Sequence, residues 1–207
     1  MISSMKKYSN EEFDKIKGIV IGRGAEKTCY LHRQNGGHCL KVSSKFKCSQ
    51  IVREIDYFEY LEKKKIRTNF LPKYFGSFEC EGLIGFEQEC FLNETSGGVC
   101  KSANTLKNYI LDINVSDEDI SRHLNALKCE MLKSCIVCGD LHGENILAIN
   151  EEGKWRLVII DGFGVPEFVP LPMYFKWFRK RKILRQWKKL ERRLKAIFTE
   201  RLELLKK

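Results

Sequence analysis

Short apolar runs separated by turn-forming residues dominate the first half of the chain. Ile19–Ile21 leads into a glycine-containing turn and a second apolar run ending at Leu31, and His38–Val42 follows the turn Asn35–Gly37. Residues 70–91 hold further short apolar runs, which are interrupted by Pro72, Gly76, Gly82 and Gly85. This alternation is typical of β-strands joined by tight turns. The first half of the chain therefore predicts a β-sheet.

Two segments instead repeat their apolar residues at helical spacing. The segment from Ile51 to Lys65 places Ile51, Ile55, Phe58 and Leu61 on one face. The segment from Asp117 to Ser134 has an acidic first turn and an apolar stripe at Ile120, Leu124, Leu127 and Met131. Spacings of three and four residues bring side chains to one face of an α-helix. We expect one helix in each segment.

A hairpin is predicted shortly after the second helix. The apolar runs Ile146–Ile149 and Leu157–Ile160 flank the turn-like sequence Asn150-Glu151-Glu152-Gly153. Two apolar runs on either side of a short polar turn ending in glycine favour antiparallel pairing.

The last part of the chain, from Phe175 to Lys207, contains neither Gly nor Pro and has the pattern of a helix. Apolar residues recur at intervals of four, three, four and three: Ile183, Trp187, Leu190, Leu194 and Ile197, with Phe198, Leu202 and Leu205 widening the seam. We expect this stripe to pack on the rest of the chain and the intervening Lys and Arg to face solvent.

Composition places the chain among globular proteins. It has 207 residues, 43% of them hydrophobic and 31% charged, and no apolar run of 18 residues that could span a membrane. The N-terminal residues lack the apolar core of a signal peptide. Nine cysteines, an odd number scattered singly, favour reduced thiols, and we interpret the pair Cys135 and Cys138 as structural. These features predict a cytoplasmic protein.

Charge is unevenly distributed. From Tyr174 to Lys207 there are 14 Lys or Arg against three Glu, whereas residues 1–173 hold 23 basic and 24 acidic residues. The aromatic residues Phe175, Trp177 and Phe178 adjoin the four cations Arg179–Lys182. This pattern favours peripheral, salt-sensitive contact with an anionic membrane surface. Nucleic acid is a competing partner, but no base-reading motif accompanies the charge.

One ordered set of polar residues carries chemistry. Asp140 is followed five residues later by Asn145, and Asp161 follows the second strand of the predicted hairpin. A kinase-type phosphotransferase needs one carboxylate to orient the accepting hydroxyl, and an amide oxygen and a second carboxylate to hold Mg²⁺. The alternative is that these are ordinary acidic loop residues beside two strands. The spacing favours Asp140 as the base and Asn145 and Asp161 as metal ligands.

The N-terminal strands carry a matching set for a nucleotide. Gly22-x-Gly24 lies in a turn between strands, where backbone amides can approach phosphates, although Lys27 stands where a third glycine is usual. Lys41 ends the next strand and can reach the phosphates, and Glu54 on the following helix can fix its position. We prefer Glu54 to Glu59 or Glu62 because the apolar face of the helix flanks it. The alternative is a solvated Lys41 paired with nothing.

In this order, the motifs resemble the protein-kinase-like fold, and most closely its aminoglycoside-phosphotransferase and lipopolysaccharide-core kinase branches. More narrowly, the chain resembles the bacterial PhoP-regulatory-network family called YrbL. The similarity covers nearly the whole chain and includes Gly22-Arg23-Gly24 with Lys27–Tyr30, Arg53-Glu54, Leu71–Gly76, Asn145–Leu147, and Pro170 through Trp177 to Trp187. The resemblance implies a nucleotide-binding set of Gly22, Arg23, Gly24, Lys27, Lys41, Glu89 and Cys90.

The sequence departs from the protein-kinase pattern at several positions. Cys138 stands where most kinases have His, His142 stands where protein kinases have Lys, and the metal motif reads Asp161-Gly162-Phe163. Few residues follow Asp161, so a large peptide-docking surface is not expected. These features favour sugars and lipopolysaccharide precursors over proteins as the hydroxyl acceptor.

We therefore predict an α+β, two-lobed kinase-like fold with a reduced helical C-lobe and a basic C-terminal helix. Residues 1–92 would form the N-lobe, residues 93–173 the C-lobe, with a boundary near Thr95–Gly98, and residues 174–207 the basic tail. The predicted function is ATP- and magnesium-dependent phosphoryl transfer to a hydroxyl, with Asp140, Lys41 and Glu54 in catalytic roles. The alternative is a catalytically inactive, nucleotide-binding regulator that acts through partners.

Overall fold

In the computed structural model, which describes residues 5–93, 101–102, 104–164 and 176–206, the chain folds as two units. The first unit comprises residues 1–67 and 72–102, and the second comprises residues 68–71 and 103–207. The architecture is α+β, as the sequence predicts. The predicted boundary at Thr95–Gly98 and the aromatic residue Phe175 lie outside the described residues.

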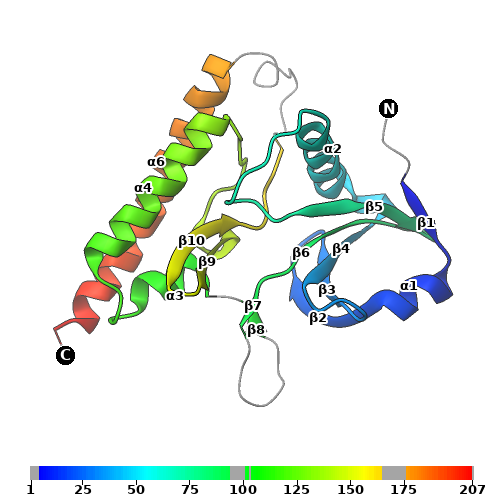
Figure 1. The fold of residues 1–207 in the computed structure, drawn as a ribbon, viewed down its shortest axis with the longest axis horizontal. Coiled ribbons are helices and arrows are strands. Elements are labelled where there is room, and N and C mark those ends of the chain that lie inside the picture. The colour runs from blue at the N-terminus through cyan, green and yellow to red at the C-terminus, as the bar shows by residue number, and fades with distance from the viewer. Residues whose placement is uncertain (1–4, 94–100, 103, 165–175, 207) are drawn as a thin grey trace. The chain divides into compact units, whose positions relative to one another are not determined.

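A six-stranded mixed sheet forms the first unit (Figure 1). Its strands lie in the order β1-β5-β6-β4-β3-β2, with β1 parallel to β5 and the other pairs antiparallel. The strand bounds are β1 Lys6–Tyr8, β2 Lys17–Arg23, β3 Thr28–His32, β4 His38–Ser44, β5 Tyr74–Cys80 and β6 Leu83–Glu89. The predicted strands around Ile19–Ile21 and His38–Val42 are confirmed as parts of β2 and β4.

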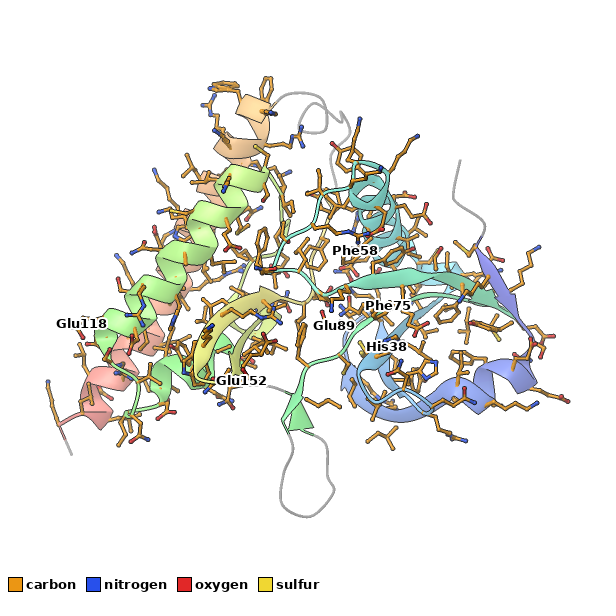
Figure 2. The ribbon with its side chains drawn as sticks, viewed as in Figure 1. His38, Phe58, Phe75, Glu89, Glu118 and Glu152 are labelled. Carbon is orange, nitrogen blue, oxygen red and sulfur yellow. The ribbon has the colours of Figure 1, made fainter. Side chains whose placement is uncertain are left out.

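Helices pack on this sheet through apolar residues. Helix α2 (Ser49–Lys63) buries Ile51, Ile55, Phe58 and Leu61, which confirms the predicted helical face. Phe58 stacks on Tyr74 with ring centroids 5.2 Å apart; Figure 2 labels this phenylalanine. The short helix α1 (Asn10–Ile16) begins in a capping box at Ser9 and buries only Phe13, which joins the core formed by Leu40, Val42 and Phe78. A 3-10 turn, η1 (Lys45–Lys47), precedes α2.

Helices and a hairpin make up the described part of the second unit. The helices are α3 (Leu106–Leu111), α4 (Asp117–Ser134) and α6 (Lys176–Leu204), and α4 lies alongside α6 (Figure 1). Strands β9 (Ile146–Glu151) and β10 (Lys154–Ile159) pair antiparallel, with Ile146 opposite Ile159, so the predicted hairpin is confirmed. Two further short strands, β7 (Leu92–Asn93) and β8 (Lys101–Ser102), belong to the first unit and pair with each other.

Helix α6 contributes core residues to the second unit. Ile183, Trp187, Leu190 and Leu194 are buried, as the seam predicts, whereas Leu202 and Leu205 are about half exposed and do not widen it. Near its end, the guanidinium of Arg201 is 3% exposed and bonds to the carbonyls of Ile110, Asp112 and Val115 and to the carboxylate of Asp117. These bonds fix the last turns of α6 to the α3–α4 connection.

The four cations at the start of α6 differ in exposure, contrary to the expectation that all face solvent. Lys180 and Arg181 are exposed, but Lys182 is 8% exposed because it lies on the edge of the buried stripe. Among the described helices, none combines the length and the apolar composition needed to cross a bilayer.

Candidate functional site

The loop after α4 presents the predicted base. Helix α4 ends at Ser134, its C-cap Cys135 has a left-handed backbone at φ 56°, and Ile136 and Val137 are then buried. Asp140 follows with a side chain that is 56% exposed. A short 3-10 helix, η2 (Gly143–Asn145), leads from this loop into β9. The loop is therefore anchored on both sides while its carboxylate stays accessible.

Hydrogen bonds join Asp140, Asn145 and Asp161 into one network. The side-chain amide of Asn145 donates to the carbonyl of Asp140 at 3.2 Å, and the N–H of Ile160 donates to the carbonyl of Asn145 at 2.9 Å. The N–H of Gly139 donates to the carbonyl of Gly162 at 2.8 Å, which ties the loop to the segment after β10. The structure thus brings together three of the residues that the sequence singles out.

Close packing explains the glycine that follows Asp161. Gly162 has φ +82°, and a Cβ atom at this position would lie 2.9 Å from the carbonyl oxygen of Asp140. Both the backbone conformation and the space exclude a side chain. The N–H of Gly162 also donates to Oδ1 of Asp161 at 2.7 Å, which orients that carboxylate.

The two predicted metal ligands, Asn145 and Asp161, carry oxygen atoms of the kind that magnesium prefers. The amide nitrogen of Asn145 is used in the bond to Asp140, so its oxygen is the atom available for a cation. Within the described ranges, no cluster of three or more His, Cys, Asp or Glu forms a metal cage. Mg²⁺ is commonly held by one or two protein oxygens together with substrate phosphates and water, so magnesium binding by Asn145 and Asp161 stays a prediction.

Two cationic or ionisable side chains flank Asp140. Nη1 of Arg193, on α6, lies 3.4 Å from Oδ1 of Asp140 and donates to the carbonyl of Leu141 at 3.0 Å. Nε2 of His142 lies 3.5 Å from Oδ2 of the same aspartate. Sequence reasoning did not single out Arg193, because only packing of α6 brings it to a loop 53 residues earlier.

The thiols beside this network are structural. The Cys138 side chain is 1% exposed and donates to the carbonyls of Asp161 at 3.5 Å and Gly162 at 3.2 Å. Cys135 is also buried and donates to the carbonyl of Leu132. The prediction that this pair is structural is supported by these contacts, and the eight cysteines in the described ranges are all free thiols. Cys138 therefore ties the loop to the segment after β10.

In the first unit, Glu54 forms a buried ion pair with Lys27. Nζ of Lys27 lies 2.8 and 2.9 Å from the two carboxylate oxygens, and the side chains are 8% and 0% exposed. The sequence placed Lys27 among the nucleotide contacts of the turn and gave Glu54 to Lys41. The structure therefore adds a direct bond between the glycine-containing turn and α2.

Lys41 lies on the same face of the sheet as two cysteine thiols. It pairs across the strands with Cys29 and Phe86, is 6% exposed, and its Nζ lies 5.7 Å from the Phe86 ring centroid. Cys39, two residues earlier on β4, shares this face. A hydrogen bond with Cys29 lowers the pKa of the Cys39 thiol, but the bond with Cys90 and burial outweigh it and raise that pKa to about 12. This thiol is therefore protonated at neutral pH.

The turn glycines are not required by the fold. Gly22 and Arg23 end β2 opposite Cys29 and Thr28, and the N–H of Gly24 donates to the carbonyl of Lys27 at 2.8 Å. An added Cβ at Gly22 or Gly24 would meet its nearest atom at 3.7 Å, an ordinary contact distance. Neither position therefore needs a glycine for packing. Because the two glycines have no side chains, space remains open beside this exposed turn.

Glu89 and Cys90 lie where β6 ends, beside β4. The Glu89 carboxylate accepts from the N–H of Lys73 at 3.2 Å, and Glu89 pairs with His38 in the sheet register. His38 stacks on Phe75 with ring centroids 3.8 Å apart; Figure 2 labels these three side chains. The N–H of Cys90 donates to the carbonyl of Gly37 at 2.8 Å. The predicted nucleotide set thus belongs to the first unit, whereas Asp140, Asn145 and Asp161 belong to the second.

Comparison with protein families establishes the relationship. A family model described as PhoP regulatory network protein YrbL matches residues 17–195. The chain belongs to the YrbL family. A sequence comparison with the curated proteins finds no match. The YrbL match begins at the first residue of β2 and extends into α6 as far as Lys195, so it includes the turn, the loop network and Arg193.

Proposed function

We propose that this YrbL-family protein is an ATP- and magnesium-dependent phosphotransferase that acts on a hydroxyl acceptor. The observation that carries the proposal is the network that holds Asp140, Asn145 and Asp161 around one loop. An exposed carboxylate beside two oriented oxygen ligands is the arrangement that phosphoryl transfer needs, because catalysis there depends on positioning and charge neutralisation.

Each residue has a role in this proposal. Asp140 accepts the proton of the acceptor hydroxyl, while Asn145 and Asp161 hold Mg²⁺, which neutralises phosphate charge. Lys41 and the exposed turn around Gly22, Arg23 and Gly24 bind phosphates, and Glu54 with Lys27 fixes the turn relative to α2. Glu89 and Cys90 complete the nucleotide set.

The test compares two carboxylate variants with the parent chain. Asp140→Asn should keep magnesium-dependent ATP binding, measured by calorimetry, but lower phosphoryl transfer from radiolabelled ATP by about 10²–10⁴-fold. Asp161→Asn should lose the magnesium dependence of ATP binding. Radiolabel transfer into fractionated lysate would report whether the acceptor is a sugar, a lipopolysaccharide precursor or a protein. Equal transfer by Asp140→Asn and the parent would remove the proposed mechanism.

A second candidate is a nucleotide-binding regulator without catalysis. The description of the family, which names a regulatory network, favours this candidate. It predicts magnesium-dependent ATP binding together with no phosphoryl release over a wide acceptor panel. It also predicts that Asp140→Asn leaves the regulatory activity unchanged, since binding alone would carry the function.

We also propose that the protein resides in the cytoplasm and contacts the anionic inner face of the membrane peripherally. The support is the first part of α6, where Trp177 is 60% exposed beside the exposed cations Lys180 and Arg181. Aromatic residues and cations together favour the interface of an anionic bilayer.

A further inference from the structure

One side of helix α6, called here its edge, packs against the loop that contains Asp140. Leu190 and Leu194 are buried, and a Cβ atom at Gly143 in the loop would lie 3.9 Å from both Leu194 and Ile197. The bonds of Arg201 hold the helix further along. The backbone of Arg193, between these anchors, is therefore held in place beside the loop.

The guanidinium of Arg193 is held in position, but only part of its hydrogen-bonding capacity is satisfied. Nη1 bonds to the carbonyl of Leu141 at 3.0 Å, whereas its distance to Asp140 is 3.4 Å, longer than the 2.7–2.9 Å of a strong charged hydrogen bond. The side chain is 52% exposed, and Nε and Nη2 make no hydrogen bond to other described residues. The loop carbonyl thus sets the position of the guanidinium, and two N–H groups remain for a ligand.

A second cation lies on the same edge of the helix. Lys189 precedes Arg193 by one turn and is exposed, and side chains at this spacing lie on one helix face. Arg192, the neighbour of Arg193, lies about 100° around the helix, and its Nε donates to the carbonyl of Lys188. The edge next to Asp140 therefore presents two cations, and Arg192 lies outside it.

We propose that Arg193 and Lys189 bind an anionic group on the acceptor, so that the acceptor is a hydroxyl compound that also carries a phosphate or a carboxylate. The inference rests on the proposed function of Asp140. In the transfer step, Asp140 takes the hydroxyl proton, the acceptor oxygen bonds to the γ-phosphorus, and the bond to the β–γ bridging oxygen breaks to release ADP. A guanidinium binds an oxyanion through two parallel N–H bonds and so places the hydroxyl at Asp140.

Binding titrations of the full chain test the subsite directly. The probes are inorganic phosphate, glucose 6-phosphate and glucuronate, with glucose as the neutral control. The parent should bind at least one of the three anions about tenfold or more tightly than glucose, since charged hydrogen bonds are among the stronger polar contacts. Arg193→Gln should abolish this preference. Arg192→Gln, which removes the same charge from the adjacent position, should retain it.

Vesicles that contain phosphatidylglycerol distinguish the source of the anion. If these vesicles alone show a dependence on Arg193 that Arg192→Gln does not reproduce, the anionic group is a lipid headgroup. If a soluble anion shows it, the acceptor is a soluble anionic compound. Anion binding that is equal in Arg193→Gln and in Arg192→Gln, or absent from the parent for every probe, would overturn the subsite.

Asp161→Asn separates failure of the subsite from failure of the proposed function. This variant should retain Arg193-dependent anion binding, which does not need Asp161. It should lose magnesium-dependent ATP binding, which does. If the parent chain binds the anion but does not bind Mg·ATP, the kinase function is rejected. The anion-binding site on α6 then stands without it. If Arg193→Gln transfers the phosphoryl group with the same ratio of kcat/KM between charged and neutral acceptors as the parent, the subsite alone is rejected.

Discussion

At the scale of single residues, the first unit contains a buried ion pair between Lys27 and Glu54. Both side chains are buried, and the ammonium contacts both carboxylate oxygens. The pair Lys45 and Glu79 has the same 2.8 Å separation, but its side chains are 42% and 36% exposed. Equal geometry at unequal burial means unequal energetics, because water solvates and screens the exposed pair, whereas the buried charges depend on protein partners.

We predict that Lys27→Met lowers the free energy of unfolding by about 3 kcal/mol. The exposed control Lys45→Met should change it by less than about 1 kcal/mol, because water already solvates both partners. The double variant Lys27→Met with Glu54→Met should recover part of the loss, since the buried carboxylate is then removed together with the ammonium. Urea unfolding followed by circular dichroism measures all three, and equal losses in the two single variants would contradict the prediction.

At the scale of elements, α3 and α4 are joined by a titratable contact. The hydroxyl of Tyr109 on α3 lies 2.7 Å from Nδ1 of His123 on α4. Burial lowers the pKa of His123 below its ordinary 6.5, and the nearby charge of Arg122 lowers it further. A neutral imidazole whose proton is on Nε2 can accept the tyrosine hydroxyl at Nδ1, whereas a protonated ring can only donate there.

Stability should therefore fall in mild acid. Below pH 6.5 the unfolded chain binds a proton that the folded His123 resists, so the unfolding free energy decreases as the pH falls from 6.5 toward the lowered pKa. His123→Gln should reduce the difference in urea midpoint between pH 7.5 and pH 5.5. His32→Gln, which removes a histidine of the first unit, should leave that difference in place, and the opposite ranking would contradict the assignment to His123.

How far the sequence predicts this protein depends on element length and on contact range. The helices α2 and α4 and the β9–β10 hairpin are predicted because each is long enough to show its period. The seven-residue α1 and the six-residue α3 are too short for a periodic signal, and the only local indication of α1 is its capping box, Ser9-x-x-Glu12.

The same distinction applies to the candidate site. Asp140, Asn145 and Asp161 lie within one loop and hairpin, so their spacing already indicates that they meet. The contact between Lys27 and Glu54 spans 27 residues, and that between Arg193 and Asp140 spans 53. Such pairs depend on how helices pack against sheets and loops, and packing leaves no local pattern in the sequence.

At the scale of the whole molecule, the formal net charge of +10 resides mainly on α6. Its buried stripe uses one face, and its first turns expose Trp177, Lys180, Arg181 and Leu184 on the others. The Arg181 guanidinium lies 5.3 Å from the Trp177 ring centroid, so aromatic and cationic groups are already adjacent.

We predict that the protein co-sediments with anionic but not with neutral vesicles. Binding should decrease as salt rises, because the Debye length falls from roughly 10 Å at 0.1 M to roughly 3 Å at 1 M. Lys180→Gln with Arg181→Gln should weaken binding more than Arg192→Gln with Lys195→Gln, since only the first pair adjoins the exposed aromatics. Absence of binding to both vesicle types would exclude a membrane role for α6.

The burial of α6 in the second unit also determines the order of events during synthesis. A chain emerges from the ribosome with its N-terminus first, and units fold as their residues become available. A nascent chain that has emerged as far as Asp161 contains every residue predicted for the phosphate and metal sites. It still lacks the four apolar side chains of α6 that complete the core, and it lacks the guanidinium of Arg201 that fixes the α3–α4 connection. The β-sheet unit can therefore fold while translation continues, but the Asp140 loop acquires its final support only after α6 has left the ribosome.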